Sequence, residues 1–433
     1  MSGPSHEPGD LIAKVASLRR VFESLEVSVN QDEWAYSALR LGTALAEVAD
    51  SNAALQEPIA LLRRAQRVLT ADRAPVEHGR IATVLGTCFR RIGETSAALS
   101  HMDTAARLLR GRVSLAEHAA TESNLATVLM EGGKLVEALP HADLAVKALA
   151  EIEAPDETER RALIAAYLNR GLIRQAMGGS YNDSRGDFVA VLDLSAGADT
   201  VLQRGMAHHA LGVLNKEHGK FTDALSEFGN ASLLLTSSTF PMQHAICRFN
   251  SAVTNEALGD TSDLRRALRD VSVALTIFDQ RLHIAQRSAA LEVRSRVITA
   301  LAVACPDMTM SDHQIQSLLE MQGDARLTLM REIFSGVKSF PSDVRSQVLL
   351  DLCDSLVKVP DSEQLMLSLV TVIMEFPDGV LVDTLSALVA SIHDHSRRND
   401  LSREVDNVIH AVLHGPQRVR VRDVLEYFGW ERP

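Results

Sequence analysis

The chain has 433 residues, of which 46% are hydrophobic but only 4% aromatic, and its formal net charge is −12. An apolar fraction of this size supports a buried core, and the scarcity of aromatic side chains favours packed helices over sheets. The acidic balance argues against a dedicated nucleic-acid binder, because neutralising phosphates requires a basic surface. We therefore expect an all-α protein without a nucleic-acid partner.

The four cysteines, Cys88, Cys247, Cys305 and Cys353, lie at least 48 residues apart. Zinc sites and disulfide frameworks use closely spaced cysteines, so we expect packed free thiols and a reducing, cytoplasmic environment. The chain also contains no run of about 18 apolar residues, the length that a transmembrane helix requires. We therefore expect no membrane partner.

The first predicted element is a helix between Leu11 and Leu25. Apolar residues occupy positions 11, 12, 15, 18, 21, 22 and 25, a spacing that places them on one face of a helix. Residues 1–29 are therefore predicted to form an N-terminal capping segment.

A small residue followed by glycine seven positions later then recurs five times, and a weaker copy starts at Gly42. The leading small residues stand at positions 42, 86, 126, 171, 212 and 252, with spacings of 44, 40, 45, 41 and 40 residues. Each copy predicts two antiparallel helices whose backbones approach at small residues, with the glycine in the turn because it adopts positive φ without strain. One pair cannot bury its own apolar face, so the pairs are predicted to stack.

These features resemble the tetratricopeptide repeat family, which has Leu-Gly in the first helix, glycine in the turn and alanines in the second helix. The resemblance implies an α-solenoid, a right-handed superhelix of six to seven units over residues 30–302. Residues 282–301 would form the seventh unit, whose repeat pattern is degenerate. The Leu-Gly pairs here are Leu41-Gly42, Leu85-Gly86 and Leu211-Gly212.

The period of 40 to 45 residues is longer than the family's usual 34. Units of this length are similar to those of kinesin light chains and of bacterial peptide-responsive regulators. We expect the extra length to come from inserts such as 156–159, and from further insertions after the turn at 180–185 and 261–263.

After about residue 303 the repeat signature stops, and proline steps followed by possible N-cap residues precede apolar runs. Residues 344–357, 364–374 and 380–392 are predicted helices. We expect residues 303–433 to form a C-terminal helical domain, either an antiparallel bundle or a HEAT-like stack. The final RVRVRDVLEYFGW segment predicts a closing helix capped by Asp423, with a partner-docking tail or a nucleic-acid contact as alternatives.

In peptide-binding members of the family, the first helix of each unit lines a concave groove, and the residue two places before the leading small residue points into it. An asparagine amide offers two donors and one acceptor, so it can pair with an extended peptide backbone. The alternative is that these amides only tie neighbouring helices together. The resemblance places at this position Arg40, Val84, Asn124, Asn169, Ala210 and Asn250.

Neighbouring groove positions supply further candidate contacts. The arginines among them are predicted to form a positive end of the groove, because guanidinium groups bind carboxylates and phosphates. The alternative is a solvated helix face that Glu47 or Glu94 neutralises. The predicted contacts besides the asparagines are Thr87, Thr127, Ser123, His209, Arg40, Arg80, Arg90 and Arg91.

The histidines form no metal-binding or catalytic pattern. His208 and His209 point about 100° apart on a helix, and His218 lies roughly three turns from His208. His393 and His395 are two residues apart, a spacing at which helical side chains also diverge. The sequence contains no GxSxG, Cys-His or phosphate-loop motif. We therefore expect no enzymatic activity, no metal and no cofactor.

The leading hypothesis is an interaction scaffold that binds a peptide or a partner's helix in its groove. The second is a sensor, in which a peptide or effector changes the superhelix pitch and acts through the C-terminal domain. An enzyme is the third, and it would require titratable groups clustered in a pocket. The expected partner is thus a protein or peptide, and a homo-oligomer remains an option.

Overall fold

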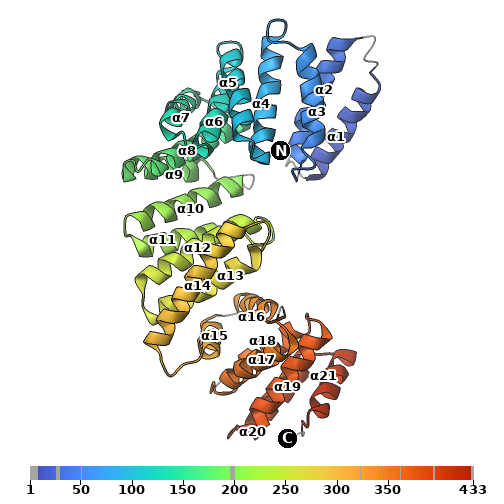
Figure 1. Ribbon diagram of the computed structural model, residues 1–433, viewed down its shortest axis with the longest axis vertical. Coiled ribbons are helices and arrows are strands. Elements are labelled where there is room, and N and C mark those ends of the chain that lie inside the picture. The colour runs from blue at the N-terminus through green and yellow to red at the C-terminus, as the bar shows by residue number, and fades with distance from the viewer. Residues whose placement is uncertain are drawn as a thin grey trace. The chain divides into compact units, whose positions relative to one another are not determined.

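The computed structural model describes residues 8–25, 30–49, 51–195, 200–321, 323–338, 340–360, 362–393 and 395–430. Within these ranges the regular elements are α-helices, and no strand occurs. The chain divides into two compact units, Met1–Leu214 and Asn215–Pro433, which are described separately below (Figure 1).

The first unit holds a leading helix, four helical hairpins and most of one further helix. The first helices of successive hairpins contact one another, since α2 contacts α4, α4 contacts α6 and α6 contacts α8. The second helices α3, α5 and α7 also contact the first helices that follow them, α4, α6 and α8. The expected stacking in sequence is therefore confirmed within this unit. The helices are α1 (Pro8–Glu23), α2 (Gln31–Val48), α3 (Gln56–Val68), α4 (Pro75–Ile92), α5 (Thr95–Leu109), α6 (Leu115–Glu131), α7 (Leu135–Ala150), α8 (Glu157–Ala176), α9 (Tyr181–Leu194) and α10 (Val201–Glu217).

The recurring glycines end the first helices as expected. Gly93 follows α4 with φ of 88°, and Gly133 and Gly178 have φ of 74° and 67°. After Gly93, the amide of Glu94 donates to the carbonyl of Phe89 at 2.9 Å, the closing bond of a Schellman turn. A residue with a Cβ would be strained at these positions.

The leading glycines were expected to let two helix backbones approach closely, but the structure shows a different reason for their small size. In three hairpins a large side chain of the second helix packs directly onto the glycine of the first helix. A Cβ on Gly42 would lie 2.7 Å from Leu62, on Gly86 2.9 Å from Met102, and on Gly171 2.6 Å from Phe188. The glycines therefore form holes for buried side chains, and the two helices interlock there.

The expected inserts are wrong as loops, because 157–159, 181–185 and 261–263 lie in helices and the preceding Asp156 and Ser180 are N-caps. Asp156 caps α8 in a capping box with Glu159, and Ser180 caps α9. Gly178 and Gly179 make this turn one residue longer than the others, so the fully buried Ser184 takes the place of the expected small residue. In the second unit α13 begins at Thr261, directly after its turn. The long period therefore reflects long helices.

The second unit begins with the end of α10 and continues the hairpin pattern, with Gly219 and Gly259 in its turns at φ of 71° and 80°. Contacts join α11 to α12, α12 to α13 and α14, and α13 to α14. The helices are α11 (Phe221–Leu234), α12 (Pro241–Leu258), α13 (Thr261–Ile277), α14 (Ile284–Ala304), α15 (Met310–Leu319), α16 (Gly323–Lys338), α17 (Ser342–Val357), α18 (Glu363–Ile373), α19 (Asp378–His393), α20 (Arg398–Val412) and α21 (Gly415–Tyr427).

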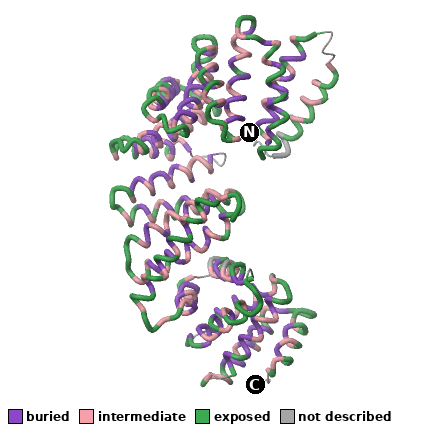
Figure 2. Tube along the Cα trace, in the orientation of Figure 1, coloured by how far each residue is buried: buried purple, intermediate pink, exposed green. Residues whose placement is uncertain are grey.

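From α15 onward, alternate helices contact one another. One layer holds α15, α17, α19 and α21, the other α16, α18 and α20, and the buried faces lie between the layers (Figure 2). Their apolar side chains form one continuous cluster from Ile315 to Leu425. This layering fits the expected stack better than a closed bundle, while the domain boundary at residue 303 stays a prediction.

The last helix begins earlier than expected. It starts at Gly415, so Asp423 lies inside α21 and does not cap it. Val421 and Leu425 are buried, and Phe428 and Trp430 pack against the same cluster, whereas Tyr427 is 83% exposed. The segment thus covers the end of this core. None of the helices in the described ranges has both the length and the apolar character that a membrane span requires.

Candidate functional site

A cavity of about 660 Å³ opens on the first-helix face of the first unit. This volume lies within the range of roughly 300–1,000 Å³ that is usual for ligand pockets. Helices α1, α2, α4 and α6 supply its walls, together with the end of α5. The lining residues are Lys14, Leu18, Tyr36, Leu39, Arg40, Thr43, Ala44, Glu77, Arg80, Thr83, Val84, Leu109, Glu117, Ala120, Thr121 and Asn124.

The position that the repeat resemblance singles out faces this cavity in three successive hairpins. Arg40, Val84 and Asn124 each stand two residues before a leading small residue, and all three line the cavity. Asn124 is half-buried, and no hydrogen bond from another described residue engages its side-chain amide. Its two donors and its acceptor are therefore available to a ligand.

The basic side chains of the cavity differ in their partners. Arg80 forks onto Glu117, with Nε–Oε1 at 2.6 Å and Nη2–Oε2 at 2.9 Å. This hydrogen bonding to Glu117 raises the pKa of Arg80 above its usual range. Arg40 and Lys14 are exposed, and neither forms an ion pair within the described part of the chain. They are the cations that an incoming anion would meet.

Arg90 and Arg91 do not join Arg40 and Arg80 in lining the cavity. Ten residues separate Arg80 from Arg90 on α4, which is about 15 Å along a helix. Arg90 pairs with Glu131 at 2.8 Å. Arg91 donates to the carbonyls of Ala46, at 2.8 Å, and Ala49, at the C-terminal end of α2. The four arginines therefore do not form the single basic end of the groove that was expected: Arg40 and Arg80 line the cavity, whereas Arg90 and Arg91 lie outside it.

The predicted hydroxyl contacts bond to their own helices. Thr87 donates to the carbonyl of Thr83 at 3.1 Å, and Thr127 donates to that of Ser123 at 3.0 Å. Thr87, Thr127 and Ser123 are absent from the cavity lining, as is the half-buried His209 of α10. Their roles in binding stay predictions.

The other two predicted asparagines connect neighbouring first helices. Asn169 on α8 donates from Nδ2 to Oγ of Ser123 on α6 at 2.9 Å. Asn250 on α12 accepts from Nζ of Lys216 at 3.3 Å. Both contacts match the structural alternative for these amides, and a peptide contact at either site stays a prediction.

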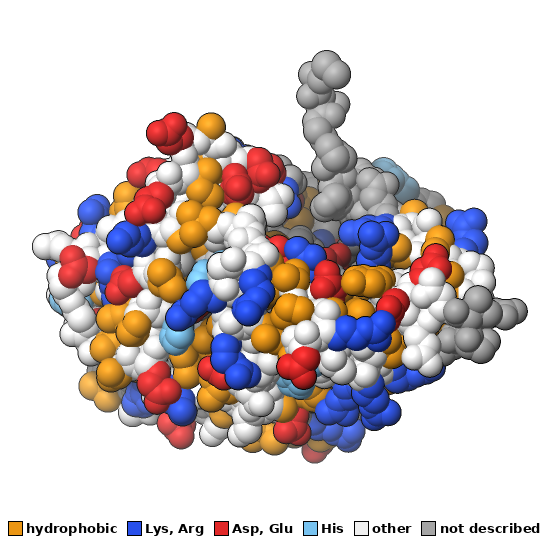
Figure 3. Space-filling view, turned by 90° about the horizontal axis from the view of Figure 1, so that it is seen from above, with side chains coloured by type: hydrophobic (Ala, Val, Ile, Leu, Met, Phe, Trp, Pro, Cys, Tyr) orange, Lys and Arg blue, Asp and Glu red, His pale blue; other side chains and the backbone are white. Residues whose placement is uncertain are grey.

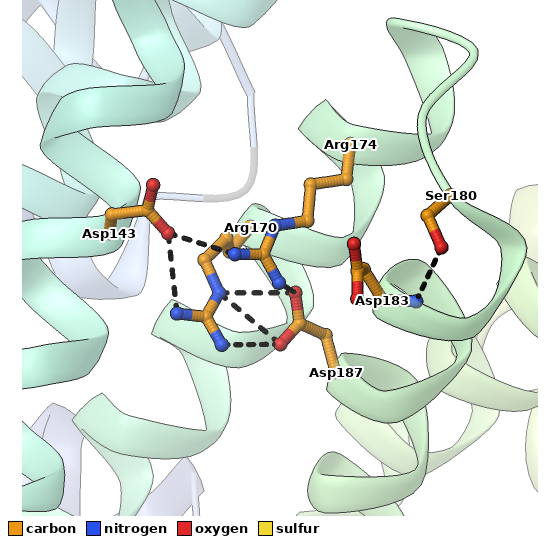
Figure 4. A network of polar contacts seen from close by, with 6 residues as sticks. All are labelled: Asp143, Arg170, Arg174, Ser180, Asp183 and Asp187. Carbon is orange, nitrogen blue, oxygen red and sulfur yellow. Dashed lines mark hydrogen bonds and ion pairs between the residues drawn. The ribbon is translucent and has the colours of Figure 1, made fainter.

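A buried ion-pair network lies between α7, α8 and α9, and the sequence interpretation missed it (Figure 4). Asp187, only 3% exposed, accepts from Arg170 at 2.6 Å and from Arg174 at 2.9 Å. Asp143 accepts from the same two arginines at 3.3 and 3.0 Å. The spacing of Arg170 and Arg174, one helical turn apart, was the available signal. The network joins three helices and opens no cavity.

A second buried carboxylate lies beside two histidines. Glu122 is fully buried, with Oε2 2.5 Å from Nδ1 of His141. Nε2 of His118 lies 3.1 Å from Oε1 but is not aligned as a hydrogen bond. Burial raises the pKa of Glu122, but the hydrogen bond from His141 and the charges of His141 and His118 together hold it below its usual range.

Two of the buried cysteines have thiols with strongly raised pKa values. Burial raises the pKa of Cys247 and of Cys353 to about 12, so both are protonated near neutral pH and unsuited to nucleophilic attack. In the part of the chain that the structure describes, no group of three or more His, Cys, Asp or Glu side chains is arranged to hold a metal ion.

The surface seen from above carries charged side chains of both signs. On this face, basic and acidic side chains are interspersed with hydrophobic ones (Figure 3).

No protein-family profile and no curated protein sequence matches this chain. Among solved structures, the apo form of the quorum sensor NprR from B. thuringiensis aligns with a TM-score of 0.52 at 12% identity, over 93% of this chain and 97% of that chain. A Rap protein complexed with competence and sporulation factor aligns with a TM-score of 0.41 at 13% identity, over 94% and 99%. BtubC from P. vanneervenii aligns with a TM-score of 0.39 at 15% identity, over 52% and 89%.

At such identities the likeness concerns the fold. Together with the stacked hairpins, the alignment with NprR confirms the expected fold class, an all-α solenoid of the tetratricopeptide type. The function of the cavity has to be argued from its own side chains.

Proposed function

We propose that the protein is a non-catalytic binding protein that holds an extended peptide in the cavity of its first unit. One observation carries the proposal: the unengaged amide of Asn124 and the exposed guanidinium of Arg40 line the same cavity, of about 660 Å³. Apolar side chains, including Leu39 and Val84, line the same cavity. An amide, a cation and an apolar wall match the backbone, the carboxylate and the side chains of a peptide.

Each group has one task in this mechanism. Asn124 accepts from a peptide N–H and donates to a peptide carbonyl. Arg40, with Lys14 beside the same cavity, binds an acidic side chain or a terminal carboxylate. The apolar wall excludes water from both contacts, and the summed interactions have to exceed the cost of ordering the peptide.

The test starts with selection of peptides from a random-sequence display library on the full-length chain, followed by titration of the selected peptides. We expect Asn124→Ala and Arg40→Met each to weaken binding about tenfold, the effect of about 1.4 kcal/mol. The control is Arg107→Met, because Arg107 is exposed on α5 outside the cavity. Equal affinities for the wild type and both cavity variants would place the binding site elsewhere.

The second candidate function is a sensor that changes its dimensions when the peptide binds. The alignment with NprR, described as a quorum sensor, supports this candidate over 93% of the chain, and solenoids deform along their length because each unit contacts only its neighbours. X-ray scattering of the full-length chain, with and without a selected peptide, separates the two. A peptide-dependent change in the radius of gyration supports a sensor, and an unchanged radius supports a scaffold.

Either function is proposed for the cytoplasm, where the free thiols would stay reduced. Neither requires a cofactor or catalysis. The third candidate, an enzyme, lacks support in the cavity, whose titratable lining is limited to two glutamates, two arginines, a lysine and a tyrosine. Glu117, one of the glutamates, is already bound by Arg80.

A further inference from the structure

A second pocket, of about 220 Å³, lies between α11, α12 and α13 of the second unit. It has no residue in common with the cavity of the first unit. Three arginines and one aspartate provide its charged lining, so positive charge is in excess. The lining residues are Leu225, Phe228, Gly229, Ser232, Arg248, Ser251, Asn255, Arg266, Arg269 and Asp270.

A buried carboxylate holds the polar wall of this pocket in place. Asp270, 1% exposed, accepts from Nη1 of Arg248 at 3.1 Å and from Nε of Arg269 at 3.3 Å. Its second oxygen accepts from the hydroxyl of Ser251 at 2.7 Å. A guanidinium carries five N–H donors, so both arginines keep donors beyond those that Asp270 uses. Arg266 donates one bond, to Asp263 at 3.3 Å.

Two polar atoms in this wall lack partners. Nε of Arg248 is buried without an acceptor, and Oδ1 of Asn255 is buried without a donor, among the residues that the structure describes. Asn255 is only 2% exposed, and its Nδ2 reaches Ser251 at 3.5 Å. Buried polar atoms are costly when unpaired. With three arginines in its lining, the pocket therefore calls for a ligand with several acceptor oxygens.

The opposite wall is apolar and leaves room. Leu225 and Phe228 line it, and a Cβ added to Gly229 would meet no atom within 4 Å. Since Gly229 is exposed and in α11, the space above it opens toward solvent. An organic group attached to the anion would fit there.

We propose that this pocket binds the phosphate group of a small phosphate monoester. The phosphate oxygens accept from Arg248, Arg266 and Arg269, which line the pocket together. A phosphate group offers three terminal oxygens and a charge of about −1.5 to −2 at neutral pH, whereas a carboxylate carries one charge and has only two oxygens to share among three guanidiniums. The organic group lies along Leu225 and Phe228. This site is independent of the proposed peptide cavity.

The experiment titrates the full-length chain by calorimetry with phenyl phosphate, inorganic phosphate and benzoate, at one ionic strength and in a phosphate-free buffer. We expect one saturable site for phenyl phosphate, with inorganic phosphate and benzoate each binding at least tenfold more weakly. Benzoate binding as tightly as phenyl phosphate would overturn the choice of phosphate. Absence of saturable phenyl phosphate binding would overturn the site.

Two variants locate the site without disturbing the buried Asp270. Arg266→Met removes a guanidinium that is half exposed, and should weaken phenyl phosphate binding about tenfold. Gly229→Met fills the open space and should abolish binding, whereas Gly229→Ala should retain it. The control Arg281→Met changes an exposed arginine in the loop before α14 and should leave the affinity unchanged.

Circular dichroism and thermal melting establish that each variant is folded. Unchanged affinity in both Arg266→Met and Gly229→Met would overturn the proposal. Arg40→Met should leave phenyl phosphate binding intact, so failure of this site and failure of the peptide cavity are told apart.

Discussion

Asn124 and Asn169 occupy the same position in successive hairpins, and their surroundings give them different roles. Asn169 donates to the hydroxyl of Ser123 in the preceding first helix, at 2.9 Å. The residue in the place of Ser123 one hairpin earlier is Thr83, whose hydroxyl donates to the carbonyl of Gly79 on its own helix at 3.1 Å. The Asn124 amide thus stays unengaged beside a cavity, while the Asn169 amide joins two helices.

The difference extends to the charges around the two residues. Beside Asn169, Arg170 is held by Asp187 and Asp143, so its donors are spent on the fold. Beside Asn124, the cavity keeps Arg40 and Lys14 without ion pairs in the described ranges. A repeat position therefore predicts which way a side chain points, and the neighbouring helix decides whether that side chain is free to bind.

The substitution Asp187→Ala is expected to have the largest effect on stability, and it tests whether the arginines beside Asn169 are needed for the fold. The substitution leaves the half-buried Arg170 and Arg174 with only the half-exposed Asp143, and should lower the free energy of unfolding by about 3 kcal/mol. Urea denaturation followed by Trp34 fluorescence measures it, in a Trp430→Phe background so that the signal reports the first unit. The control is Asp143→Ala, with an expected loss below about 1 kcal/mol. Equal losses would contradict a network centred on Asp187.

The next effect concerns the holes that interlock the hairpins. Gly171→Ala places a methyl group 2.6 Å from the buried ring of Phe188 and should destabilise the first unit by about 1–2 kcal/mol, since overpacking outweighs the gain in helix propensity. Gly186→Ala on α9 is the matched control, because nothing lies within 4 Å of its added methyl. That variant should be stabilised by about 0.5–1 kcal/mol. The same denaturation assay tests both, and a stable Gly171→Ala would contradict the interlocking.

A smaller effect separates the two asparagines directly. Asn169→Ala removes the bond to Ser123 and should lower stability by about 1 kcal/mol. Asn124→Ala should change stability by less than about 0.5 kcal/mol while weakening peptide binding. Thermal melting and peptide titration of both variants measure the two quantities. If both variants lose stability equally, the comparison between the two regions fails.

The smallest effect is expected from Glu122→Gln and depends on pH. The folded-state pKa of Glu122 lies below its usual range, so its ionised form contributes stability above the unfolded pKa of about 4.3, and this contribution disappears as pH falls through the folded value. The difference in urea midpoint between wild type and variant should therefore shrink below about pH 4.3. A difference that grows on acidification would show that Glu122 is not held ionised by its neighbours.

The repeat positions made most of the fold predictable. Six small residues at near-constant spacing located the first helices, and the glycines seven residues later located their ends, because both positions depend on local geometry. The inserts were misplaced because spacing alone does not distinguish a longer helix from a longer loop. Asp156 and Ser180 cap helices, so the residues that follow them are helical, and only one extra residue lies in the turn before Ser180.

The candidate site was predictable only in part. The resemblance put Arg40, Asn124 and Arg80 on one face, and all three line the cavity. It also put Arg90 and Arg91 there, although their charges are used by Glu131 and by the end of α2. Which partner a long side chain takes depends on residues some 40 positions away, on another helix, and no local pattern records that choice.

The division of the apolar interior has a consequence for how the chain opens. Between α2 and α14 the buried apolar residues fall into several clusters, the largest of which extends from Trp34 to Ile173, whereas from Ile315 to Leu425 they form a single one. Separate clusters let one group of hairpins open while the others persist, so amide hydrogens of the array should exchange with solvent at rates that differ from cluster to cluster. Around the single cluster, opening any helix exposes side chains shared by the rest, and protection there should be lost in one cooperative step.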